Sequence, residues 1–87
     1  MVRVRYVSYL KIAAGRKEED FELSNGDSAG EVIRKLAEKH GGDLKDRLIS
    51  REGGLKVVFS INGESAGEEA ELSEGDVLSV MPPLAGG

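Results

Sequence analysis

The amino-acid sequence predicts a small α+β fold in which a mixed β-sheet wraps around one main helix. Apolar and polar residues alternate over residues 2–9, as in a strand that is buried on one side. A capped amphipathic helix follows over residues 28–40, and alternation returns over residues 55–62 and 76–81. A hairpin, one packed helix and a returning final strand together favour a roll built on a four- to five-stranded sheet.

The chain has 87 residues, the size of one domain with a modest core and little room for a deep cleft. It has no cysteine, which excludes disulfides, zinc–thiolate sites and cysteine-ligated iron–sulfur clusters. No apolar run approaches the ~20 residues of a membrane span, and no signal-peptide pattern is present. We therefore expect a cytoplasmic protein that does not associate with membranes.

The first strand reads VRVRYVSY, and we expect Val2, Val4 and Tyr6 to point into the core. The segment AAGRK at 13–17 is expected to form a turn. A second, shorter strand follows in EEDFEL, with Phe21 and Leu23 pointing inward. Residues 1–24 are therefore predicted to form a β-hairpin whose loop is longer than a two-residue turn.

The main helix has clear signals at both ends. Ser28 and Glu31 match a capping box, in which each side chain accepts a hydrogen bond from the other residue's backbone amide. Apolar residues then recur on one side of the helix from 29 to 37. Lys39 and His40 lie in the last turn, where the helix dipole favours cations, and a glycine pair ends the helix.

The remaining elements are shorter. DLKDRLIS at 43–50 is predicted to be a second helix, and LKVVFSIN at 55–62 a strand. Residues 64–76 are predicted to be mostly loop, with at most a very short edge strand. The final strand ends before Pro82, which has no amide to donate to a sheet.

We accordingly divide the chain into a globular domain at residues 1–81 and a flexible tail at residues 82–87. No metal site is expected, because His40 has no neighbouring cysteine or second histidine. The acidic residues at 68–71 lack the spacing of a calcium-binding loop.

Charge is distributed unevenly along the chain. The net charge of −4 argues against nucleic acid as the main partner. Residues 1–17 nevertheless carry five cations and no acid, whereas residues 62–76 carry six acids and no base. These segments form either two solvated surfaces or a molecule with a basic pole that docks an acidic partner.

Strand alternation also predicts what lies on the outer face of the sheet. If Val2 and Val4 face the helix, then Val7, Val58 and Met81 face away from it. We expect these three side chains to form an apolar patch with a basic rim. The rim residues are Arg3, Arg5 and Lys56. Such a patch is typical of a docking surface, and ordinary scattered surface apolarity is the alternative.

The sequence ends in MPPLAGG, directly after the final strand. The six tail residues are Pro82, Pro83, Leu84, Ala85, Gly86 and Gly87. The prolines fix two φ angles at the root of the tail, and the glycines have no side chain to obstruct a narrow passage. Residues 84–87 can extend roughly 13 Å. Once joined to AMP, the carboxylate of Gly87 would be open to attack by a thiol, a sulfide or an amine. Fraying of a chain end is the alternative explanation.

The ending PPLAGG resembles the PPVAGG-type terminus of the molybdopterin synthase small subunits, which belong to the ubiquitin-like sulfur carriers of the MoaD/ThiS superfamily. VRVRYVSYLKIAAG is similar to the opening KVLFFAxLRELAG of that family, and LSEGDVLSVMPP resembles its L.DGDEVAFFPP. The segment INGE also matches. The resemblance spans the whole chain and implies a β-grasp, or ubiquitin-like, fold.

The resemblance also implies a reaction cycle. An E1-like adenylyltransferase of the MoeB/ThiF type, which uses ATP and magnesium, would adenylate Gly87, and a sulfur donor would convert the adenylate to a thiocarboxylate. The tail would then enter the large subunit of molybdopterin synthase (MoaE type) and deliver sulfur to a pterin precursor in molybdenum cofactor biosynthesis. The chain would bind no cofactor itself and would not be catalytic alone.

Two alternatives remain open. The chain would act as an archaeal-type ubiquitin-like modifier, conjugated to lysines through Gly87 and carrying sulfur for tRNA thiolation. Otherwise, it would be a ubiquitin-like binding domain whose terminus never reacts. These hypotheses differ in whether the Gly87 carboxylate reacts and in what it reacts with.

Overall fold

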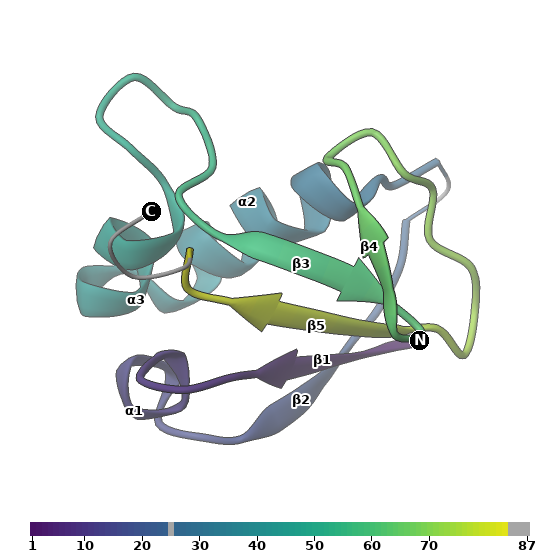
Figure 1. Ribbon diagram of the computed structural model, residues 1–87, viewed down its shortest axis with the longest axis horizontal. Helices are drawn as coiled ribbons and strands as arrows, with labels where there is room; N and C mark the ends of the chain where they lie inside the picture. The colour runs from purple at the N-terminus through teal and green to yellow at the C-terminus, as the bar shows by residue number, and fades with distance from the viewer. Residues whose placement is uncertain (25, 84–87) are drawn as a thin grey trace.

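The computed structural model describes residues 1–24 and 26–83, and within them a five-stranded mixed sheet is packed against helices (Figure 1). The strands are β1 (Val2–Tyr6), β2 (Glu18–Phe21), β3 (Val58–Ile61), β4 (Glu64–Ala66) and β5 (Val77–Met81). They lie in the order β2–β1–β5–β3–β4. The central pair β1–β5 is parallel and the other neighbouring pairs are antiparallel. This arrangement confirms the predicted α+β class.

Three helices lie in the described part of the chain: α1 (Leu10–Ala14), α2 (Ala29–His40) and α3 (Gly42–Leu48). Helix α2 crosses one face of the sheet, and α1 and α3 lie toward one end of it (Figure 1). None of the helices in residues 1–24 and 26–83 is both long enough and apolar enough to cross a membrane.

The hydrophobic core forms between α2 and the inner face of the sheet. Val2 and Val4 of β1 are fully buried, as the alternation predicts, and so are Leu78 and Val80 of β5. The apolar side of α2 covers them, with Leu36 completely buried. Burying an aliphatic side chain of this size stabilises the fold by roughly 1.5–3 kcal/mol. The outer face of the sheet is therefore left for other contacts.

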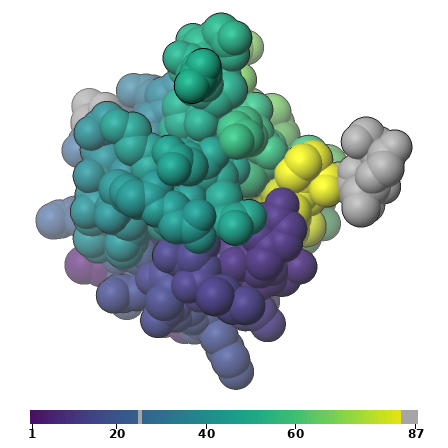
Figure 2. All heavy atoms as spheres, turned by 90° about the vertical axis from the view of Figure 1, so that its left-hand side faces the viewer, coloured from purple at the N-terminus to yellow at the C-terminus, as the bar shows by residue number. Residues whose placement is uncertain are grey.

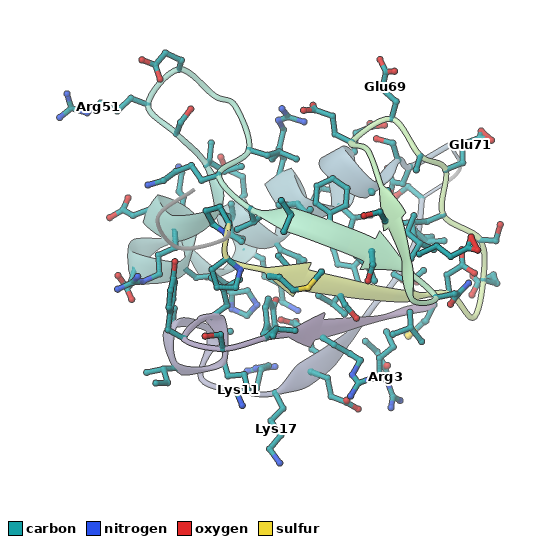
Figure 3. The ribbon with its side chains drawn as sticks, in the orientation of Figure 1. Arg3, Lys11, Lys17, Arg51, Glu69 and Glu71 are labelled. Atoms are coloured by element: carbon teal, nitrogen blue, oxygen red, sulfur yellow. The ribbon has the colours of Figure 1, made fainter. Side chains whose placement is uncertain are left out.

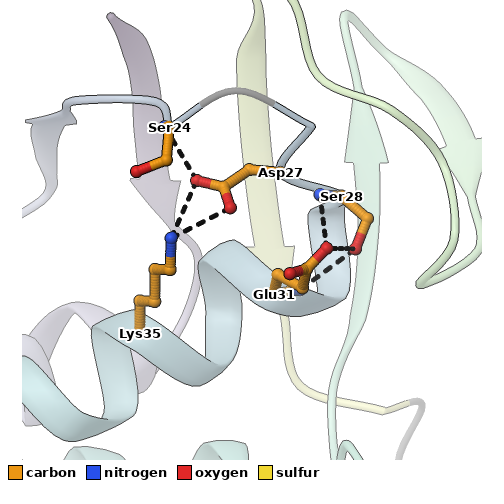
Figure 4. A network of polar contacts seen from close by, with 5 residues as sticks. All are labelled: Ser24, Asp27, Ser28, Glu31 and Lys35. Carbon is orange, nitrogen blue, oxygen red and sulfur yellow. Dashed lines mark hydrogen bonds and ion pairs between the residues drawn. The ribbon is translucent and has the colours of Figure 1, made fainter.

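The start of α2 has the predicted capping box (Figure 4). The Oγ atom of Ser28 accepts a hydrogen bond from the amide of Glu31 at 3.3 Å, and the Glu31 carboxylate accepts one from the amide of Ser28 at 3.3 Å. Next to the box, Lys35 Nζ lies 2.9 Å from Asp27 Oδ1. The hydrogen bonds from Lys35 and from the Ser24 amide lower the pKa of Asp27. These contacts fix the first turn of α2 against the segment that leads into it.

The predicted hairpin over residues 1–24 is correct in its pairing and wrong in its connection. Strand β1 ends at Tyr6, earlier than predicted, and residues 10–14 form α1, where part of the turn at 13–17 was expected. Ser8, with φ of 60°, turns the chain out of the strand, and Gly15, with φ of 75°, ends the helix. The buried Leu10 anchors this single turn of helix, and five residues are too few for a periodic signal.

The later elements follow the prediction with shorter bounds. The predicted helix at 43–50 is observed as α3, and the very short edge strand is β4. The strand predicted over 55–62 is shorter, because residues 55–57 lie outside β3. Leu55 instead forms an isolated bridge with Ile49, which closes the loop that projects beside α3. The alternation survives, since Val57 and Phe59 are both buried.

Candidate docking surface and tail root

The three apolar residues that were predicted to share the outer face come together there. Val58 of β3 is the register partner of Met81 of β5, and the amide of Val7 donates to the carbonyl oxygen of Val80 at 3.0 Å. Val58 and Val7 remain 49% and 39% exposed. With Tyr9 they line a shallow groove of about 360 Å³, which we call the apolar groove.

The root of the tail lies in the same groove. Pro82 and Pro83 complete its wall directly after β5, so the chain leaves the sheet across the apolar surface. In Figure 2 this end of the described chain, in yellow, lies at the surface beside the amino-terminal segment, in purple. The tail residues 84–87, including the predicted reactive Gly87, lie outside the described residues.

One side of the apolar groove is supported by an aromatic contact. The guanidinium carbon of Arg47 lies 4.8 Å from the centre of the Tyr9 ring. Arg47 is itself held by Asp43, with Nε 3.0 Å from Oδ2. A cation over an aromatic ring stabilises an exposed contact by about 0.5–1 kcal/mol. This contact connects the segment between β1 and α1 to helix α3.

A second, polar groove of about 480 Å³ adjoins the first and shares Val7, Ser8 and Met81 with it. We call it the basic groove. Its charged lining consists of three cations and one acid: Arg5, Lys11, Lys17 and Glu18. Its floor carries the cross-strand pair Ser60 and Ser79. The two grooves together form one continuous outer face with an apolar half and a cationic half.

The predicted basic rim is only partly where the sequence placed it. Arg3 is held by Glu18 at 2.8 Å and by Asp20 at 3.2 Å. Lys56 lines neither groove, because its Nζ atom donates to the backbone oxygen of Asp46 at 2.7 Å. Of the three predicted cations, Arg5 alone lines the groove, at 3.7 Å from Glu18.

One buried carboxylate, Glu19 on the inner face of β2, was not predicted from the sequence. The Glu19 side chain is only 4% exposed. Its oxygens lie 2.6 Å from Tyr6 Oη, 2.9 Å from Lys39 Nζ and 2.7 Å from His40 Nε2. Burial alone would raise the pKa of Glu19, but hydrogen bonds from these three groups outweigh it and lower the pKa to about 2. Glu19 therefore ties strand β2 to the end of helix α2.

Glu19 lies on the same face of β2 as Phe21, so strand alternation contained the signal that it points inward. Its partners Lys39 and His40 come from the end of a helix far along the sequence. No group of three or more acidic or histidine side chains in residues 1–24 and 26–83 is arranged to hold a metal ion.

Comparison with known proteins gives matches over almost the whole chain. The pattern of the ThiS family matches residues 4–87. Small archaeal modifier protein 3 of Haloferax volcanii is 29% identical over 92 residues, covering 99% of this chain and 98% of the relative. A molybdopterin synthase sulfur carrier subunit of Chlamydomonas reinhardtii is 26% identical over 88 residues, again covering 99% of this chain and 98% of the relative.

A solved structure confirms the fold. The crystal structure of small archaeal modifier protein 1 of Haloferax volcanii matches with a TM-score of 0.87, over 95% of this chain and 97% of that chain. The two sequences are 22% identical, so this likeness bears on the fold alone. The predicted ubiquitin-like β-grasp fold is therefore correct.

Proposed function

This chain belongs to the ThiS family and is a ubiquitin-like sulfur carrier, and on that premise we propose that it is the sulfur-carrying small subunit of a molybdopterin synthase. The observation that carries this proposal is a relative, matched over 98% of its length, that is itself a molybdopterin synthase sulfur carrier subunit. The family match, which extends through the tail to Gly87, supports carrier chemistry at that residue.

The proposed chemistry takes place at the Gly87 carboxylate. One carboxylate oxygen attacks the α-phosphorus of ATP within the activating enzyme, forming a C–O–P linkage, and pyrophosphate leaves. Hydrosulfide then attacks the carbonyl carbon and loses its proton. The new C–S bond replaces the C–O bond to AMP, which leaves with the bonding electrons. Neither step changes an oxidation state, and the product is a thiocarboxylate that can deliver sulfur to a pterin.

The described surface is suited to this role because the tail leaves the sheet beside an apolar groove. A partner that covers Val7, Val58 and Met81 would also hold Pro82 and Pro83, and so would direct the following residues into its own active site. The fixed φ angles of the two prolines lower the entropy lost when the tail is inserted. We propose that the E1-like adenylyltransferase and the large subunit each use this groove, one after the other.

Conjugation to proteins is the second candidate function. It is favoured by the relative that is 29% identical and is itself a small archaeal modifier protein. The chemistry diverges only after adenylation, when a lysine amine instead of a sulfur nucleophile attacks the acyl carbon. The tail and the apolar groove would serve both reactions equally.

An acceptor experiment separates the two candidates. The chain would be converted to its thiocarboxylate by its activating enzyme, ATP and sulfide, and then mixed with the large subunit and the pterin precursor. Dithiolene product, together with return of the chain to its carboxylate mass, would support the synthase role. Isopeptide-linked adducts in cell extract, without pterin product, would instead support the modifier. A variant lacking Gly87 is the matched control in both arms.

A further inference from the structure

The basic groove contains positive charge that the protein does not neutralise itself. Three cations and one acid line it, an excess of two positive charges in a chain whose net charge is −4. The acid, Glu18, already pairs with Arg3 at 2.8 Å and with Arg5 at 3.7 Å. Among residues 1–24 and 26–83, Lys11 and Lys17 form no ion pair. Both are exposed.

The position of these lysines distinguishes them from ordinary surface charge. They project together at the lower edge of Figure 3, whereas the acidic residues Glu69 and Glu71 lie toward the opposite side of the same view. The two lysines and these acids therefore lie on different sides of the molecule, and the basic groove adjoins the apolar groove that contains the root of the tail. Such a separation of charge orients an oppositely charged partner before contact and raises the rate of association.

We propose that the basic groove binds an acidic segment of the protein that covers the apolar groove, with Lys11 and Lys17 as the residues that select and steer it. This inference rests on the proposed function, because it assumes that a protein partner docks where the tail begins. The two grooves share Val7, Ser8 and Met81, so one peptide segment can contact both. The occupant would carry carboxylates beside apolar side chains.

The lining of the groove favours a protein segment over other anions. The hydroxyl groups of Ser60 and Ser79 supply hydrogen-bonding groups on the floor, beside the lysine ammonium groups. A nucleic acid would be repelled by the net charge of −4. A small phosphate compound would make no favourable contacts with the apolar groove. The inference also revises the predicted rim, since it replaces Arg3 and Lys56 with Lys11 and Lys17.

The first test needs no partner enzyme. The isotopically labelled chain would be titrated at low salt with an oligo-glutamate peptide, and the amide shifts of residues 8, 11, 17 and 79 would be followed by NMR. The variant Lys11→Glu/Lys17→Glu should lose these shifts. The control variant Lys45→Glu/Arg51→Glu reverses the same number of charges outside both grooves and should retain them.

The second test measures association with the activating enzyme by stopped flow at two salt concentrations. The groove variant should associate about tenfold more slowly at low salt, and the difference should shrink as salt rises. The control variant Lys45→Glu/Arg51→Glu should associate at the wild-type rate at both salt concentrations. If the wild-type chain formed no thiocarboxylate with the activating enzyme, that result would count against the proposed function. The peptide titration would still decide whether the basic groove binds an acidic segment.

Three results would overturn the inference. The first is peptide binding that maps outside the groove or is weakened equally in the control variant. The second is that inorganic phosphate produces the same shifts at similar concentrations, which would indicate a small-anion site. The third is concentration-dependent self-association that the groove variant abolishes, which would make a second copy of this chain the occupant.

Discussion

Replacing Glu19 by glutamine should weaken the fold by an amount that depends on pH. Glu19→Gln keeps the size of the side chain and removes the charge that Tyr6, Lys39 and His40 surround. The pKa of Glu19 falls from an ordinary 4.5 to about 2 in the folded protein. At about 1.4 kcal/mol for each unit of pKa, this shift corresponds to as much as about 3 kcal/mol of stability at neutral pH.

The direction of the pH dependence follows from the lowered pKa. A carboxylate that is more acidic in the folded state stabilises that state fully above pH 4.5, where it is ionised in both states. The stabilisation is lost as pH falls from 4.5 toward 2, because the unfolded chain then binds the proton more readily. The difference between wild type and variant should therefore shrink to roughly 1 kcal/mol near pH 2.5.

Urea unfolding monitored by circular dichroism at several pH values between 2.5 and 7 would measure this difference. Glu22→Gln is the matched control, since Glu22 follows β2 and is exposed, and it should change the free energy of unfolding by no more than about 0.5 kcal/mol. A Glu19→Gln effect that stays constant across the pH range would refute the reasoning. So would an effect no larger than that of the control.

Three further substitutions test the packing and the docking surface. Gly30→Ala would place a methyl group 2.7 Å from the Cβ atom of Glu68 and 3.0 Å from its carbonyl oxygen, and should lower the free energy of unfolding by about 1–3 kcal/mol in urea titration. Ser28→Ala removes the acceptor for the Glu31 amide and should cost about 1 kcal/mol by thermal unfolding. Val7→Asp should leave stability within about 0.5 kcal/mol. It should nevertheless weaken binding of the activating enzyme at least tenfold by calorimetry; unchanged binding would remove the apolar groove from the proposed function.

Local patterns were sufficient to predict the main elements of the fold. The capping box at Ser28 and Glu31 involves residues three apart, so it can be read directly from the sequence. The alternation of Val2, Val4 and Tyr6 identified the inner face of β1 for the same reason. Helix α1 was missed because one turn of helix is stabilised by the packing of Leu10, and not by any periodicity of its own.

The parts that could not be predicted depend on residues far apart in the sequence. Arg3 was expected to present its charge to a partner, but the register of β1 and β2 places Asp20 directly opposite it. The Nζ atom of Lys56 bonds to the backbone of Asp46, near the end of α3.

The outward direction of Val7, Val58 and Met81, in contrast, was predicted correctly, because alternation fixes the face of a strand residue whatever its neighbours are.

The central claim is that the Gly87 carboxylate is the group that becomes activated and carries sulfur, and one mass measurement tests it most directly. The chain would be incubated with its activating enzyme, ATP and sulfide, and then fragmented in a mass spectrometer. We predict replacement of one oxygen by sulfur, confined to the fragment that contains Gly87, and no change when ATP is omitted. An unchanged mass in the presence of a demonstrably active enzyme, or sulfur attached at any other residue, would contradict the account.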